Sequence, residues 1–118
     1  MAEDWARPLV HWEIQAKDPE KARAFYAKMF NWEITVAGPI LNIPAGIGAP
    51  DSGPAGHIRA SAASGFVPYF QVLDLGASLA RAAELGGSVT RPAFDVPGGP
   101  TIAGIADPEG NAIVLVQQ

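Results

Sequence analysis

The segment Val10–Ile34, VHWEIQAKDPEKARAFYAKMFNWEI, contains a strand pattern followed directly by a helix pattern. Its first part, LVHWEIQA from Leu9 to Ala16, alternates apolar with polar residues. Such alternation predicts a strand with one dry face and one polar face. The polar face carries three side chains able to exchange protons or hydrogen bonds, and they are the first candidate site residues: His11, Glu13 and Gln15.

A helix is expected to begin after this strand, because Asp18 suits the N-cap and Pro19 the first helical position. Asn31 tolerates the left-handed conformation that ends such a helix. Apolar residues recur at helical spacing, and we expect this stripe to be buried in the core: Ala22, Phe25, Tyr26, Met29 and Phe30. The next residues, WEITV from Trp32 to Val36, predict a second strand.

The second half of the chain shows the same order of elements. Val67–Leu73 predicts a strand, and Asp74 or Ser78 is a candidate cap for a helix that ends at Gly86-Gly87. The apolar stripe of this helix is Leu75, Leu79, Ala82 and Leu85. Three strands are expected to follow: one that begins with Ser88-Val89-Thr90, then Thr101–Ala106 and Ala112–Val116. In the Gly- and Pro-rich middle of the chain, we expect two short strands joined by a loop around residues 46–56: Ile40–Ile43 and His57–Ala60.

The two halves therefore repeat the order strand, helix, three strands, at an offset of about 55 residues. We expect one α+β domain over residues 1–118, built from two βαβββ modules at about 8–62 and 66–118. The modules are expected to pair into a cupped, barrel-like mixed sheet whose polar faces line the concavity. The helices would cover the outer face, which carries Trp12, Ile14, Phe70, Val72, Ile113 and Leu115.

Composition narrows the class of protein. The 118 residues include no cysteine, so disulfides and thiolate chemistry are excluded. Eight basic and twelve acidic residues give a net charge of −4 without a positive stripe, which argues against a nucleic-acid partner. The acidic start and the lack of a long apolar run predict a cytoplasmic protein without a signal peptide or a membrane partner. No phosphate-binding loop, nucleophile elbow or HExxH motif is present.

Three segments carry a resemblance to a known family. The opening VHWEIQAKDPEKARAFYAKMFNWEI, the middle FQVLDLGASLARAAELGGSVTRP and the closing IADPEGNAIVLVQQ resemble the glyoxalase/bleomycin-resistance/extradiol-dioxygenase superfamily, also called the vicinal oxygen chelate (VOC) superfamily. The chain is most similar to its small, lactoylglutathione-lyase-like members. The resemblance implies paired βαβββ modules, a homodimer as the usual assembly, and a small-molecule ligand held in the cup.

The same resemblance implies a divalent metal that polarises substrate oxygens as a Lewis acid. His11 matches the first ligand position, but the other two positions fall on Val67 and Val114, which have no donor atom. Divalent sites need several imidazole or carboxylate ligands. We therefore expect no cofactor, with a divalent metal disfavoured; a compensating site would need Glu13 together with His57 or Glu33.

Two functional classes stay open at this point. The first is a lyase- or isomerase-type enzyme that uses His11 and Glu13 as acid–base groups on a small polar metabolite. The second is a non-catalytic protein that sequesters a small molecule or antibiotic, as bleomycin-resistance proteins do. A carboxylate at Glu13 would be costly to bury unpaired on the concave face, so we expect either a water-filled cavity or a nearby partner such as His11 or Arg59. The candidate ligand-binding residues are Gln15, His57, Arg59, Tyr69 and Gln71.

Overall fold

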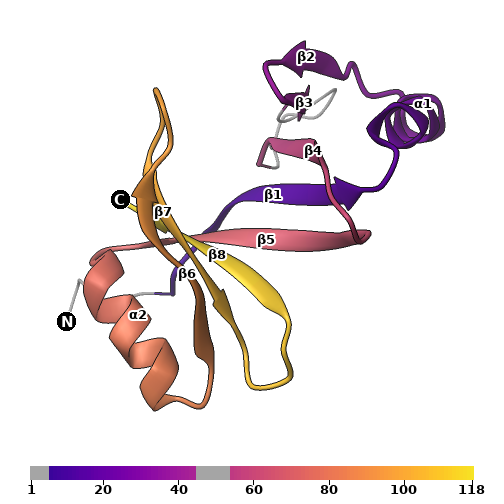
Figure 1. Ribbon diagram of the computed structural model, residues 1–118. Coiled ribbons are helices and arrows are strands. Elements are labelled where there is room, and N and C mark those ends of the chain that lie inside the picture. The colour runs from indigo at the N-terminus through magenta and orange to yellow at the C-terminus, as the bar shows by residue number, and fades with distance from the viewer. Residues whose placement is uncertain (1–5, 45–53) are drawn as a thin grey trace. The chain divides into compact units, whose positions relative to one another are not determined.

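The computed structural model describes residues 6–44 and 54–118, and it has the expected α+β architecture (Figure 1). The elements of the first module are β1 (Leu9–Ala16), α1 (Pro19–Phe30), β2 (Thr35–Ala37), β3 (Ile40–Ile43) and β4 (Gly56–Ala60). Those of the second module are β5 (Gly65–Val72), α2 (Leu75–Glu84), β6 (Ser88–Asp95), β7 (Thr101–Ala106) and β8 (Ala112–Gln117). The predicted repeat of strand, helix and three strands is confirmed.

The chain forms two compact units, which are described separately. One is His11–Val67, and the other joins the residues up to Val10 with Pro68–Gln118. In the first, β2, β3 and β4 pair antiparallel in that order, and β4 pairs in parallel with β1. The parallel pairing places Glu13 opposite His57, and Gln15 opposite Arg59. Within this unit the four strands are therefore paired as part of a mixed sheet.

Helix α1 begins and ends where the sequence predicts. The Asp18 carboxylate accepts from the backbone N–H of Lys21 at 3.2 Å, which satisfies one of the free donors at the helix N-terminus. Asn31 has φ 58° and ends the helix in the left-handed conformation. One face of the helix packs against a core of buried aliphatic residues: Ile14, Ala16, Ile34, Leu41, Ile43 and Ile58. Trp12 and Trp32 complete this cluster.

The predicted buried stripe of α1 is wrong in part. Phe25, Met29 and Phe30 are 60%, 63% and 51% exposed, whereas Ala22, Tyr26 and Ala27 pack against the core. The helix is rotated toward Ala27, and this rotation carries Phe25 and Met29 away from the sheet. Phe30, in the last turn, contacts the rings of Tyr26 and Trp32 at 6.2 and 5.2 Å between centroids.

The second module has the corresponding sheet. Strand β5 pairs in parallel with β8, which is antiparallel to β7, and β7 is antiparallel to β6. Asp74, not Ser78, caps α2 by accepting from the backbone N–H of Ala77 at 3.0 Å. The helix and the sheet share a core of buried Val72, Leu75, Ala103 and Leu115, with Phe70, Leu79, Ile105 and Ile113 packed against it. Each helix therefore covers the predicted apolar face of its module, which carries Trp12 and Ile14 in the first module and Phe70, Val72, Ile113 and Leu115 in the second. This expectation is confirmed.

Three smaller differences from the sequence prediction concern element ends. Strand β2 covers Thr35–Ala37 instead of Trp32–Val36, and the Trp32 ring, which precedes it, stacks on Tyr26 with centroids 5.9 Å apart. Leu85, expected on the buried stripe of α2, is the C-cap residue and is 61% exposed. Most of the predicted 46–56 loop lies outside the described residues. Neither helix in the described part of the chain is long and apolar enough to cross a membrane.

Candidate functional site

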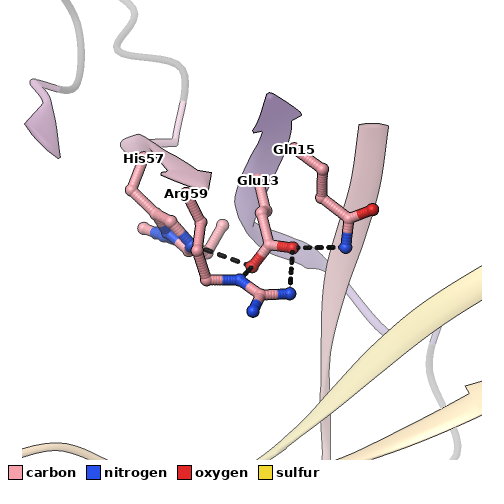
Figure 2. A network of polar contacts seen from close by, with 5 residues as sticks. Glu13, Gln15, His57 and Arg59 are labelled. Carbon is pink, nitrogen blue, oxygen red and sulfur yellow. Dashed lines mark hydrogen bonds and ion pairs between the residues drawn. The ribbon is translucent and has the colours of Figure 1, made fainter. Parts of the chain in front are cut away.

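A buried carboxylate lies at the centre of the polar face of the first module. Glu13 is 4% exposed and accepts four hydrogen bonds from three side chains (Figure 2). His57 Nε2 lies 2.9 Å from Oε1, and Gln15 Nε2 donates to Oε2 at 2.8 Å. Arg59 donates through Nε to Oε1 and through one terminal nitrogen to Oε2, both at 3.2 Å. The four donors match the lone pairs of an ionised carboxylate.

A second imidazole extends this cluster. His11 Nε2 lies 2.7 Å from His57 Nδ1, and the two rings stack with their centroids 4.9 Å apart. A continuous chain of contacts therefore runs from the Glu13 carboxylate through both nitrogens of His57 to His11. We call Glu13, Gln15, His57, Arg59 and His11 the polar cluster.

The register between β1 and β4 builds the cluster. Successive side chains of β4 point to opposite faces of the sheet, so Ile58 faces the core while His57 and Arg59 face the other side. The parallel pairing with β1 then places His57 and Arg59 beside Glu13. Gly56 makes this pairing possible, because a Cβ atom there would lie 2.6 Å from the Trp12 ring and 2.8 Å from its carbonyl oxygen. The Trp12 indole N–H also donates to the Pro54 carbonyl at 2.9 Å.

Burial favours the neutral imidazole at His11, which belongs to the same cluster as the Glu13–Arg59 ion pair. Arg59 forms an ion pair with Glu13, whose side chain is 5% exposed while that of Arg59 is 45% exposed. Burial lowers the pKa of His11 and the adjacent His57 lowers it further, whereas the Glu13 charge raises it. A neutral imidazole is the form that accepts a proton.

The structure brings five of the seven predicted site residues together in the polar cluster. The other two, Tyr69 and Gln71, lie on the polar face of β5 in the second module, opposite Val114 and Val116. The sequence did not show that His57 connects Glu13 with His11. The alternation in Gly56–Ala60 was the available signal, but only the β1–β4 register determines which residues it meets.

An open hollow of about 390 Å³ lies at the end of β1 in the first module. Its lining includes Gln15, Lys17, Lys21, Tyr26 and Ser64. Gln15 thus lines the hollow and also donates to Glu13. The hollow offers both charged and aromatic surface next to one member of the polar cluster.

The donor set does not fit a divalent metal as it is arranged. The two nitrogens of His57 are directed to different partners, Nδ1 to His11 and Nε2 to Glu13, so the three side chains do not converge on one point. The Glu13 carboxylate already holds the Arg59 cation on both oxygens, and this cation would repel a metal ion. Among the described residues, no group of three or more His, Cys, Asp or Glu side chains is placed to hold a metal.

Comparisons with known proteins agree with this fold. The sequence model of the Glyoxalase/Bleomycin resistance protein/Dioxygenase superfamily matches residues 9–115. Since the match spans nearly the whole chain, the protein belongs to this superfamily, as its sequence motifs predict. No curated protein matches the sequence.

Solved structures of low sequence identity share the fold. A superfamily member from Vibrio splendidus 12B01 is 13% identical, with a TM-score of 0.67 over 96% of this chain and 100% of the other. Methylmalonyl-CoA epimerase from Mycobacterium tuberculosis is 18% identical, with a TM-score of 0.62 over 99% and 95%. A variant of homoprotocatechuate 2,3-dioxygenase from B. fuscum is 15% identical, with a TM-score of 0.68 over 93% of this chain and 32% of the other.

Proposed function

We propose that the protein is a lyase- or isomerase-type enzyme that moves a proton on a small polar metabolite without a bound divalent metal. His11 is the general acid–base group, and Glu13 takes part as the buried carboxylate that holds His57, which in turn contacts His11. One observation carries the proposal: a buried, ionised Glu13 is joined through His57 to an imidazole whose pKa is lowered. Such pairing of a carboxylate with imidazole is typical of acid–base sites.

The remaining predicted residues suit the binding of a polar ligand. The Arg59 guanidinium is partly exposed, and its positive charge suits an anionic group of the ligand. Gln15, which lines the hollow of the first module, keeps its predicted role in orienting the ligand. Tyr69 and Gln71 stay separate predictions for the second module. We also propose a homodimer, supported by the exposed apolar side chains of α1: Phe25, Met29 and Phe30. Sedimentation analysis would detect it.

The test is deuterium wash-in, because it detects proton transfer before the product is known. The protein is incubated in D₂O with a panel of small carbonyl and carboxylate metabolites, and incorporation at carbon is measured by mass spectrometry. We expect at least one metabolite to exchange, and His11→Ala to abolish the exchange. If a metabolite raises the unfolding temperature of the protein but no metabolite in the panel incorporates deuterium, the result would instead indicate a sequestering protein.

Metal content is measured on the same preparation. Elemental analysis of protein purified without chelators should give far less than one equivalent of any divalent metal, and exchange should survive chelator treatment. Stoichiometric metal that disappears in His11→Ala would overturn the metal-free part of the proposal.

A further inference from the structure

The hydrogen bonds of the polar cluster determine where the protons lie on both imidazoles. Glu13 accepts from three donating groups besides His57, two on the Arg59 cation and one on the Gln15 amide. It is therefore ionised and can only accept. His57 Nε2, 2.9 Å from Oε1, must carry the hydrogen, because a lone pair facing the carboxylate would be repelled.

The position of the hydrogen on His57 also determines where the hydrogen lies on His11. When His57 is neutral with its hydrogen on Nε2, its Nδ1 carries a lone pair. His11 Nε2, 2.7 Å away, must then be the donor in the contact between the rings. The neutral His11 ring accordingly carries its lone pair on Nδ1, and this atom is the basic nitrogen of the pair.

We propose that His57 is a positioning residue that sets the His11 tautomer and receives the proton which His11 takes up. The step balances as follows: a bond between hydrogen and a substrate atom breaks as His11 Nδ1–H forms. His11 Nε2–H then breaks as His57 Nδ1–H forms. The positive charge ends on His57, 2.9 Å from the Glu13 carboxylate, and Glu13 stays ionised. The existence of a substrate that gives up a proton rests on the proposed function. The positions of the protons on the two imidazoles rest on the hydrogen bonds alone.

The chain is suited to a direct test because His11 and His57 are its only histidines. Protein labelled with ¹⁵N-histidine therefore gives two ring systems in a long-range ¹H–¹⁵N spectrum, and the peak pattern distinguishes the two neutral tautomers. At a pH where both rings are neutral, we expect both to carry hydrogen on Nε2. On addition of the first proton, His57 should become doubly protonated and His11 should switch to the Nδ1–H tautomer.

Variants separate a positioning role from a general loss of structure. Glu13→Gln removes the acceptor-only partner, so His57 and His11 should both become tautomer mixtures. Gln15→Ala is the matched control, because Arg59 still holds both Glu13 oxygens and the tautomers should not change. Folding of each variant is checked by its backbone amide spectrum.

Either of two results would overturn the inference: hydrogen on Nδ1 of the neutral His11 ring, or a first proton that leaves His11 doubly protonated. Neither depends on a substrate. If the tautomers are as stated and no metabolite exchanges deuterium, the proposed function fails while the inference stands. If exchange occurs with the opposite tautomer, the inference fails alone.

Discussion

The two modules have the same order of elements but opposite chemistry on their corresponding strand faces. In the first, the face shared by β1 and β4 carries the polar cluster. In the second, the face shared by β5 and β8 pairs Tyr69 with Val114, and Gln71 with Val116. The backbone pairing is parallel in both, so the difference lies in the side chains alone.

This contrast shows how a repeated fold can place its chemistry in one half. Each module supplies a helix-covered core, and both cores contain the aliphatic residues expected from the sequence pattern. On the other face, the first module carries His57, Glu13 and Arg59 on β1 and β4, whereas β5 and β8 carry Tyr69 and Gln71 opposite valines. Burying ionisable groups is costly unless they are paired, and the cluster pairs each of them. Substitutions that exchange the chemistry of the two modules therefore test the assignment of the site.

The largest effect is expected from His11→Ala, which should lower turnover or deuterium exchange by roughly 10²–10⁴-fold because it removes the acid–base group. Rates are compared at saturating metabolite. Val67→Ala is the control, since Val67 stands in β5 where His11 stands in β1. A similar loss in both variants would show that the first module has no special role.

Gly56→Ala should destabilise the protein by about 2–3 kcal/mol, because the new methyl group meets the Trp12 ring and backbone. Urea unfolding measures the loss. In Gly65→Ala, at the start of β5, the new Cβ would meet only the Gln15 side-chain oxygen at 3.9 Å, an ordinary contact. Equal losses in the two variants would contradict the close Trp12–Gly56 approach.

Arg59→Leu should cost about 2 kcal/mol of folding stability, since it leaves the Glu13 charge buried without its cation. The effect is smaller than for a fully buried pair because water reaches Arg59. The double variant Glu13→Leu/Arg59→Leu should recover much of the loss, as it makes this face resemble the second module. A double variant that is less stable than Arg59→Leu would mean that Glu13 is held mainly by its other partners.

The sequence predicted the modules better than it predicted the contacts within the site. Strands β1 and β5 were predicted from the alternation of apolar and polar residues, and helices α1 and α2 from the N-caps Asp18 and Asp74. These signals are local, so the sequence alone was enough to place these elements. The position of His57 between Glu13 and His11 depends on a pairing across 44 residues, which no local pattern specifies. The exposure of Phe25 also escaped prediction, because helical spacing defines a stripe but not the rotation of the helix over its sheet.

The smallest effect concerns the pH dependence of stability near neutrality. Burial and the neighbouring His57 lower the pKa of His11 in the folded protein, while Glu13 raises it. The unfolded chain therefore binds this proton more tightly, with an ordinary pKa of about 6.5. The contribution of His11 to stability is complete above that value and is lost as the pH falls through it toward the lower folded pKa.

Urea midpoints measured from roughly pH 8 to 5.5 cover this window, where carboxylates of ordinary pKa stay ionised. His11→Val copies Val67, and we expect it to flatten the pH dependence. The second module contains no histidine, so any slope that survives in His11→Val must come from His57 or from a group with a shifted pKa. An unchanged slope would mean that His11 has the same pKa in the folded and the unfolded protein. Its lowered pKa, and with it the neutral base on which the proposed proton transfer depends, would then have to be abandoned.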